Sequence, residues 1–306
     1  MKELQIIKIA TRKSKLALVQ AELVKNRLMA VFPAIAVEII PMSTTGDENT
    51  DRSLSEIGGK GLFTKELEEE LLSGTFDIAV HSLKDMETKL PQGLVISSVL
   101  EREDPRDALI ASEGKTIATL EKGARVGTSS MRRSAQLKII RPDLEIMPFR
   151  GNVTTRIEKL KKGEVVATLL AVAGLKRLGM ENEATEILDT ENFIPAVGQG
   201  IIAIECREDN YDLRAMLAGI NHAPTLYASI AERSMLARLD GSCRTPIAGY
   251  ARFEDGKLRL DAMVANLDGT RHVKATKTGD AEKAQAMGEE LAEELLANGG
   301  RECLTK

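Results

Sequence analysis

Five groups of polar and charged residues stand directly after stretches that we expect to be β-strands. Ligands of open parallel sheets bind at the carboxyl ends of the strands, so this position is informative. Arginine occurs in four of the five groups, and its guanidinium can bond a carboxylate or a phosphate through two parallel hydrogen bonds. We therefore predict a site for an anionic small molecule. The groups are TRKS at 11–14, SLKD at 82–85, TSSMRR at 128–133, RGNVTTR at 150–156 and AVAGLKR at 171–177, which ends in Lys176 and Arg177.

The third and fourth groups have the composition of an anion site at a helix N-terminus. In GTSSMRR, hydroxyl groups and free backbone N–H groups gather where a helix is expected to begin. In RGNVTTR, Asn152 can cap the next helix between Arg150 and Arg156. The alternative is ordinary capping, by Ser129 or Ser130 in the first group, with arginines exposed to solvent. Two such groups close together in the chain favour the anion site.

Positive charge is concentrated in the middle of an acidic chain. Residues 121–180 hold 13 Lys and Arg against 5 Asp and Glu, whereas the protein of 306 residues has a formal net charge of −4. This imbalance indicates an anionic small molecule and not a nucleic acid. The alternative, a solvated lysine-rich face, fits Lys159, Lys161 and Lys162 but not the arginines. Six Phe, three Tyr and no Trp leave too few rings for an RNA-stacking surface.

The second group pairs a cation with an anion. Lys84 can bind a substrate carboxylate and Asp85 can face a developing positive charge; the alternative is a surface ion pair, which contributes little. His81 ends the preceding strand and is expected to be a packed histidine. Because His222 and His272 lie far away in the sequence, we expect no histidine-based metal site. Glycine motifs that bind nucleotide phosphates are absent, so nucleotide chemistry has no support.

The chain has three cysteines, an odd number that excludes a disulfide scaffold and indicates a reducing, cytoplasmic setting. Cys206 ends an apolar strand and is expected to be a buried small hydrophobe, and Cys303 lies close to the C-terminus. Cys243 stands in the loop LDGSCRTP beside Arg244, where it is either an exposed thiol or a nucleophile or attachment point. The longest apolar runs are too short to span a bilayer, and we expect no secretion signal, no membrane association and a monomer.

Short apolar runs alternate with amphipathic stretches through the first two thirds of the chain, which predicts parallel sheets covered by helices on both faces. The polar stretch 43–61 is expected to be a long functional loop. The run 201–206 is expected to return to the first sheet, with crossings near 101–107 and 194–200 acting as hinges. Expected strands are 6–10, 37–42, 76–81, 94–100, 108–111, 125–127, 144–149, 165–170, 201–206, 247–253, 258–264 and 272–276. Expected helices are 14–29, 64–72, 130–140, 153–162, 171–178, 225–239 and 281–297.

These stretches together resemble the porphobilinogen deaminase (hydroxymethylbilane synthase) family over essentially the whole chain and in family order. Each is a weak signal alone, but ten in register are specific. The matching stretches are IATRKSKLALVQAE (9–22), GGKGLFTKELE (58–68), DIAVHSLKD (77–85), EREDPRDA (101–108), VGTSSMRRSAQL (126–137), RPDL (141–144), FRGNVTTR (149–156), LLAVAGLKRLG (169–179), PAVGQGIIAIECR (195–207) and AERSMLARLDGSCRTPIAGYA (231–251).

The resemblance implies an α/β fold with two periplasmic-binding-protein-like lobes containing doubly wound sheets. A small α+β C-terminal domain with a three-stranded antiparallel sheet follows. Domain 1 would comprise 1–100 and 200–219 and carry the catalytic aspartate and the loop. Domain 2 would be the arginine-rich lobe at 101–199, and domain 3 would be 222–306 with the attachment cysteine.

The resemblance also implies a transferase of tetrapyrrole and haem biosynthesis. Four porphobilinogen molecules would be deaminated and joined head to tail on a covalent dipyrromethane primer. Hydrolysis would then release linear hydroxymethylbilane, with ammonia as by-product. The attachment residue that matches the family is Cys243, through a thioether.

The implied site residues are positions of this chain that match the family motifs. Asp85 matches the catalytic carboxylate. Positions that would hold the cofactor are Ser14, Lys84, Asp85, Thr128, Ser130, Arg132, Arg133 and Arg156. Positions that would bind substrate are Arg12, Arg150, Arg177, Gln199, Phe63 and Lys60, the last two beside the loop 43–61. No metal is implied.

Two positions depart from the family pattern. Glu87 stands where proline is usual, and Lys13 where a small or polar residue is common; neither removes a catalytic position. Two other functions fit parts of the chain. A non-catalytic two-lobed anion-binding module would explain the arginines but leave Cys243 and the C-terminal domain idle. A transferase for phosphorylated sugars would need a phosphate loop that is missing.

Overall fold

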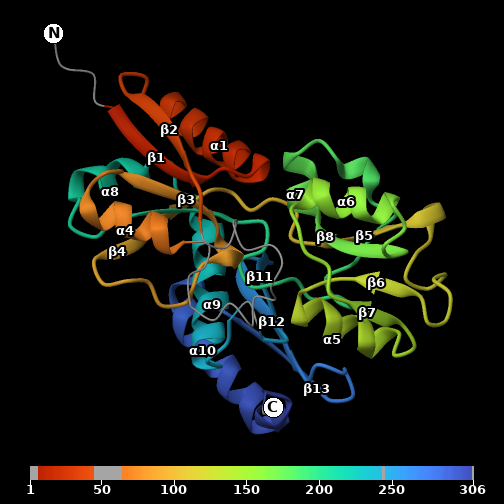
Figure 1. Cartoon of the computed structure of the whole chain (residues 1–306). Helices are drawn as coiled ribbons and strands as arrows, with labels where there is room; N and C mark the ends of the chain where they lie inside the picture. Colours follow the sequence, from red (N-terminus) through yellow and green to blue (C-terminus); the bar gives the residue numbers. More distant parts are fainter. Residues whose placement is uncertain (1–5, 45–63, 243–244, 305–306) are drawn as a thin grey trace. The chain divides into compact units, whose positions relative to one another are not determined.

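The computed structural model describes residues 6–44, 64–242 and 245–304. The chain divides into two compact units, one comprising Met1–Arg102 with Ile201–Leu226 and the other Glu103–Gly200 with Tyr227–Lys306 (Figure 1). The chain therefore leaves unit one after Arg102 and returns to it at Ile201, as the two predicted crossings require.

Unit one is a five-stranded sheet between helices. Its order is β2-β1-β3-β10-β4, with β1 parallel to β2 and β3, and β10 antiparallel to both of its neighbours. Helices α1 and α8 cover one face through Val24, Leu28 and Leu217, and α4 covers the other through Leu67 and Leu71. The elements are β1 (Ile6–Arg12), α1 (Lys15–Val31), β2 (Ala36–Met42), α4 (Lys65–Ser73), β3 (Ile78–Ser82), a 3₁₀ turn (Leu83–Asp85), β4 (Leu94–Val99), β10 (Ile202–Arg207) and α8 (Tyr211–Ala218).

The first sheet of unit two has the order β7-β6-β8-β5-β9, in which β5 is antiparallel to β8 and β9. Helix α5 packs on one face through Leu137, and α6 and α7 pack on the other through Ile157, Leu160 and Leu175. The elements are β5 (Asp107–Ala111), β6 (Arg125–Gly127), α5 (Met131–Ile140), β7 (Glu145–Met147), α6 (Val153–Lys161), β8 (Ala167–Ala171), α7 (Val172–Arg177) and β9 (Glu186–Ile187).

The C-terminal part is a three-stranded antiparallel sheet, β11-β12-β13, with helices on one face. Met235 of α9 and Leu291 of α10 lie in its core. Ala248 and Met263 on the other face of the sheet pack against Ala135 of α5, so this sheet and the second lobe form one unit. The elements are α9 (Ala223–Arg238), β11 (Ile247–Glu254), β12 (Lys257–Ala265), β13 (His272–Gly279), α10 (Ala284–Leu295) and α11 (Arg301–Leu304).

The predicted fold class is confirmed: two sheet-containing α/β lobes and a small three-stranded antiparallel C-terminal part. The expectation of purely parallel sheets is wrong, because each lobe has one reversed strand. Strands β5 and β10 each enter their sheet from a crossing between the units and not from a preceding helix of the same lobe. Each is therefore antiparallel to its neighbours in the sheet. Helix α8 and the two-residue strand β9 were not predicted. The division into three domains at the expected boundaries stays a prediction.

Candidate functional site

In unit one, the first two predicted groups lie side by side. Strands β1 and β3 are parallel neighbours, so the residues after each strand meet at one edge of the sheet. A pocket at this edge includes Arg12, Ser14 and Asp85 among its lining residues. The full lining is Arg12, Ser14, Leu16, Ala17, Gln20, Thr64, Val80, His81, Ser82 and Asp85.

Short-range hydrogen bonds fix the shape of this edge. Ser14 caps α1, and its Oγ accepts a hydrogen bond from the backbone N–H of Ala17 at 3.3 Å. Gln20 Nε2 donates to Ser82 Oγ at 2.8 Å, which ties α1 to the end of β3. In the following 3₁₀ turn, Leu83 is buried and its N–H donates to the carbonyl of Ile201 at 3.0 Å. Asp85, at the end of the same turn, is exposed.

A group of buried ionisable side chains lies against the same pocket. His81 Nε2 is 3.0 Å from Glu205 Oε2, and both side chains are buried. Burial raises the pKa of the nearby Glu68 carboxyl. Thr64 and His81 oppose this rise, whereas Glu205 and Glu87 add to it. His81 is packed, as predicted. Its carboxylate partner was missed, because Glu205 lies more than a hundred residues further along an apolar strand.

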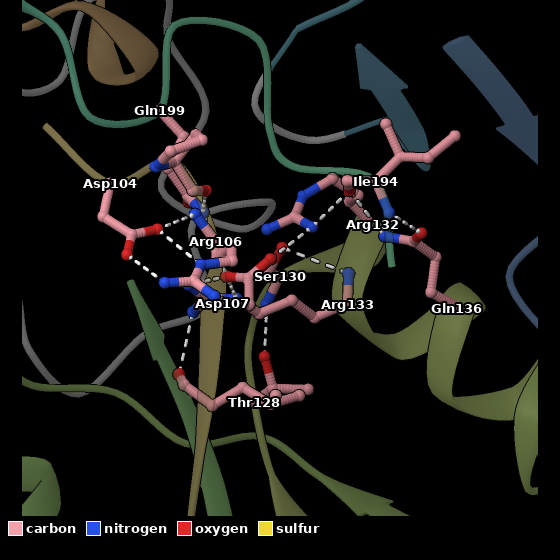
Figure 2. Close-up of polar contacts among 12 residues, drawn as sticks. Asp104, Arg106, Asp107, Thr128, Ser130, Arg132, Arg133, Gln136, Ile194 and Gln199 are labelled. Carbon is pink, nitrogen blue, oxygen red and sulfur yellow. Dashed lines mark hydrogen bonds and ion pairs between the residues drawn. The ribbon is translucent and has the colours of Figure 1, made fainter. Parts of the chain in front are cut away.

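In unit two, Asp107 holds two of the predicted arginines (Figure 2). Arg133 donates to Asp107 Oδ1 from Nε at 2.9 Å and from Nη2 at 2.7 Å. Arg132 Nη1 donates to Asp107 Oδ2 at 2.8 Å and to the carbonyl of Ile194 at 2.9 Å. Gln199 Nε2 adds a bond to Asp107 Oδ1 at 3.2 Å and one to the carbonyl of Pro105 at 2.6 Å. These side chains are all buried.

The cluster of Asp107, Arg132 and Arg133 has one more positive than negative charge. Burial by itself would raise the pKa of the Asp107 carboxyl, but Arg132 and Arg133 outweigh it and lower that pKa. Burial lowers the pKa of the Arg132 guanidinium, and Asp107 opposes the shift. Within the described part of the chain, the buried Nε of Arg132 has no hydrogen-bond partner. The arrangement has excess positive charge and a spare donor, which suits an anionic ligand.

The turn before α5 is built as the sequence predicts. Ser130 is the N-cap, and its Oγ accepts from the N–H of Arg133 at 3.4 Å, while Thr128 Oγ1 accepts from the N–H of Ser130 at 3.2 Å. Glycine is required at 127, because a Cβ there would lie 2.6 Å from Cγ of Phe149. The hydroxyls of Thr128 and Ser130 are therefore held by capping bonds beside the first turn of the helix.

The turn before α6 carries two more predicted arginines. Asn152 caps the helix, with its Oδ1 accepting from the N–H of Thr155 at 2.9 Å. Arg156 Nε donates to the carbonyl of Gly151 at 2.8 Å, and both Arg150 and Arg156 are half-buried. Neither arginine is in the Asp107 cluster, which indicates that they occupy a separate position in the lobe.

Arg177 lies against the second crossing. Its Nη2 donates to the carbonyl of Gly200 at 2.7 Å. Burial lowers the pKa of Arg177 to about 10, with Glu103 opposing the shift, so the guanidinium stays charged at neutral pH. The neighbouring Lys176 is paired with Glu103 of the first crossing, with Nζ and Oε1 3.0 Å apart. The fifth predicted group therefore joins α7 to both crossings.

Several predicted residues lie outside the described residues: Lys60 and Phe63, most of the loop 43–61, and Cys243 with Arg244. The other two thiols, Cys206 and Cys303, are buried, and burial raises the pKa of both. A buried carboxylate missed in the sequence lies on α9: Glu232 accepts from the N–H of Gly198 at 2.6 Å and of Ala251 at 2.7 Å. It links the second crossing to strand β11.

The described residues provide neither a helix that is long and apolar enough to cross a bilayer nor a cluster of side chains suited to a metal ion. The first finding covers all described helices, and the second covers groups of three or more His, Cys, Asp or Glu.

The fold and the site define a two-lobed α/β protein with cationic side chains after several of its strands. Two family models match the chain. The model for the porphobilinogen deaminase dipyrromethane cofactor-binding domain matches residues 7–215, and the model for the porphobilinogen deaminase C-terminal domain matches residues 226–297. The chain belongs to the porphobilinogen deaminase family.

Solved structures with a similar chain arrangement include three bacterial proteins. YhfZ from Shigella flexneri is 21% identical, with 77% of this chain and 96% of that chain covered and a TM-score of 0.37. The probable amino-acid transporter extracellular-binding protein ytmK from Bacillus subtilis is 14% identical, with 76% and 97% covered and a TM-score of 0.45. A TRAP periplasmic solute-binding protein from Desulfovibrio salexigens is 13% identical, with 71% of each chain covered and a TM-score of 0.44.

Replacing the Asp107 carboxylate by an amide tests its role in holding the arginines. Because Asp107→Asn leaves two buried guanidiniums without a counter-charge, we expect it to lower the free energy of unfolding by about 3–5 kcal/mol at pH 7. Urea denaturation of the wild type and the variant measures this difference. Asp143→Asn is the control: it breaks a partly exposed pair with Arg141 and should have a much smaller effect.

The same variant makes a prediction about pH. The pKa of Asp107 is lower in the folded than in the unfolded protein, so its contribution is complete above the unfolded value of about 3.9 and is lost as pH falls toward the folded value. The stability difference between wild type and Asp107→Asn should therefore be smaller at pH 3 than at pH 7. Equal stability at pH 7, or a difference that does not shrink in acid, would contradict the assignment.

Proposed function

We propose that the protein is a hydroxymethylbilane synthase, which deaminates four porphobilinogen molecules and joins them head to tail. The observation that carries the proposal is the lining of the unit-one pocket: in a chain of the porphobilinogen deaminase family, Asp85 shares one pocket with Arg12 and Ser14. A carboxylate beside a guanidinium and a helix N-terminus suits a substrate that has carboxylates and develops a positive charge.

Asp85 is proposed as the catalytic carboxylate. When the aminomethyl group of porphobilinogen loses ammonia, the remaining pyrrole carries a positive charge shared between the ring nitrogen and the methylene carbon. An exposed carboxylate at the end of a fixed turn can accept a hydrogen bond from the pyrrole N–H. It then stabilises this charge where it develops, without reorganisation of the site. It can also take part in proton transfers at the amine and at the ring carbon.

The cations are proposed to bind the acetate and propionate side chains of the pyrroles. Arg12 and Lys84 would supply them in unit one, and Arg150, Arg156 and Arg177 in unit two. Phe63, Lys60 and Gln199 are proposed to complete the substrate contacts. Since Gln199 is buried and bonded to Asp107, it would act mainly by fixing the second crossing.

The donor set of unit two fits a dipyrromethane cofactor, whose pyrroles also carry carboxylates. The excess positive charge around Asp107, the spare Nε of Arg132 and the capped N-terminus of α5 are the observations that support this fit. The residues proposed to hold the cofactor are Ser14, Lys84, Asp85, Thr128, Ser130, Arg132, Arg133 and Arg156. Bound dipyrromethane would supply the free pyrrole carbon from which the product chain begins.

Cys243 is proposed as the covalent attachment residue. The family match supports it, and so do the other two thiols, whose burial and raised pKa disfavour the reactive thiolate. The proposed three-domain division places Cys243 in domain 3, between α9 and β11. The protein is further proposed to act in the cytoplasm, as a monomer, in tetrapyrrole and haem biosynthesis.

Intact-mass spectrometry tests the attachment. Protein purified from cells that make porphobilinogen should be heavier than its sequence by two pyrrole units, and peptide mapping should place the adduct on Cys243. Cys243→Ser should have the unmodified mass and no activity, whereas Cys303→Ser keeps the adduct. An adduct on another residue, or an unmodified mass from such cells, would contradict the proposal.

Asp85→Asn tests the catalytic carboxylate. The amide keeps the size of the side chain but removes its charge, so we expect turnover to fall by at least about a hundredfold while the mass adduct remains. Asp77→Asn is the control, because it removes a carboxylate at the other end of β3. There the Asp77 side chain accepts a hydrogen bond from the N–H of Lys8 at 2.8 Å. Wild-type turnover in Asp85→Asn would refute the assigned role.

A further inference from the structure

A buried histidine–carboxylate pair lies against the pocket that contains Asp85. His81 lines this pocket, and its Nε2 is 3.0 Å from Oε2 of Glu205. The exposed fractions of the two side chains are 4% and 0%. An acid and a base this deeply buried are rare without a function or a strong structural reason, because burial disfavours their charged forms.

The topology brings the two residues together. On the antiparallel strands β3 and β10, Ala203 pairs with His81 and Glu205 pairs with Ala79, so His81 and Glu205 lie diagonally on one face of the sheet. Leu67 and Leu71 of α4 pack around Ala79 on this face and exclude water. The reversed strand that returns from the second crossing therefore supplies the partner of a pocket residue.

His81 Nε2 and the Glu205 carboxylate approach each other and have no other hydrogen-bond partner among the described residues. Within the described chain, neither oxygen of Glu205 has a well-aligned donor, and His81 Nε2 has no well-aligned partner apart from its close approach to Glu205. A buried carboxylate without donors is costly, so a proton shared between the imidazole and the carboxylate is the arrangement that stabilises both. With Nε2 directed to Glu205, Nδ1 is the ring nitrogen left to exchange a proton with the pocket.

Ionisable groups of α4, of the segment after β3 and of β1 lie near this pair. Helix α4 contributes Glu68, whose pKa is raised mainly by burial, and the segment after β3 contributes Glu87 and Asp85. Strand β1 contributes Arg12 to the same pocket. The balance is acidic, which favours a proton entering the group from the pocket.

We propose that His81 is a second proton acceptor of this pocket, with Glu205 as the residue that orients it and stabilises its charged form. The proposal rests on the proposed function, which requires such an acceptor. It adds to the role of Asp85, which stabilises positive charge on the pyrrole and can take part in proton transfer: here the proton that leaves the ring carbon in the coupling step is assigned to His81.

The coupling step shows what is transferred. The C–N bond of the protonated aminomethyl group breaks with its electron pair on nitrogen, giving ammonia and a cationic methylene carbon. The free α-carbon of a second pyrrole then forms a C–C bond to that methylene. Its C–H bond breaks, the electron pair returns to the ring, and the proton passes to His81 Nδ1. The proton leaves as ammonium with the ammonia released, so the cycle needs no oxidant or reductant.

His81→Gln separates this role from a structural one. The glutamine amide can still donate to Glu205 from the position of Nε2, but it has no basic nitrogen. We expect kcat to fall by about ten- to a hundredfold with KM changed less than about threefold, with the mass adduct retained. The acid limb of the kcat–pH profile should disappear. His272→Gln, on the exposed surface of β13, is the matched control and should behave as wild type.

Glu205→Gln and a spectroscopic readout complete the test. The amide removes the charge that stabilises the imidazolium, so the acid limb should move to lower pH. Independently of turnover, the ¹⁵N resonances of His81, assigned by their loss in His81→Gln, should differ between the wild type and Glu205→Gln, because the amide removes the charge that faces the imidazole. If His81→Gln fails to fold, the kcat–pH profile of Glu205→Gln decides alone: an acid limb that stays where it is in the wild type overturns the proposal.

The outcomes are distinct. If the wild type forms hydroxymethylbilane but His81→Gln keeps the wild-type kcat and pH profile, the role of His81 is overturned and the proposed function stands. If the wild type itself consumes no porphobilinogen, the proposed function fails, whatever the resonances show.

Discussion

Guanidinium groups that are buried close together repel one another, and the second lobe depends on a buried carboxylate that holds them in place. Asp107 is the main example: it accepts hydrogen bonds from Arg132, Arg133 and Gln199. Without it, two guanidiniums would be buried side by side with no counter-charge, which costs several kcal/mol. One carboxylate against two guanidiniums keeps the lobe folded and still leaves a net positive charge for a ligand carboxylate.

The same carboxylate also links distant parts of the chain. Asp107 begins the strand that follows the first crossing, Gln199 lies on the second crossing, and the arginines lie on α5. Glu232 has a similar place in the C-terminal part, where it joins the second crossing to β11. Buried acids therefore fix the crossing segments inside unit two.

That returning strand is important for the pocket as well as for the fold. β10 runs between β3 and β4, and it places Glu205 beside His81 and the carbonyl of Ile201 at the turn that ends in Asp85. Residues more than a hundred positions apart in the sequence are thus held together beside this pocket. The turn that ends in Asp85 is therefore tied to the returning segment as well as to its own strand.

Much of this could be predicted from the sequence, because local patterns determine it. Strand 125–127 and the caps Ser14, Ser130 and Asn152 follow from apolar runs and short polar side chains at helix starts. The convergence of Arg12 with Asp85 follows from their positions at strand ends. Family motifs supplied the reaction, the cofactor and the role of Cys243, which no spacing rule contains.

What the sequence could not supply is non-local. Asp107 in EREDPRDA reads as one acid among several, and only the fold shows that it, and not its neighbours, receives both arginines. Glu205 and Glu232 lie in apolar or amphipathic stretches where a single acid carries no pattern. The reversed direction of β5 and β10 was missed for the same reason, because strand direction depends on where the chain crosses between units.

The ratio of ammonia to hydroxymethylbilane produced tests most directly whether this chain makes hydroxymethylbilane. Purified protein that carries the cofactor is mixed with porphobilinogen, and ammonia and hydroxymethylbilane are quantified over a time course. The account predicts four ammonia molecules for each hydroxymethylbilane, with the protein returning to its starting mass. No consumption of porphobilinogen by protein with the adduct in place, or ammonia released without a linear tetrapyrrole, would contradict it.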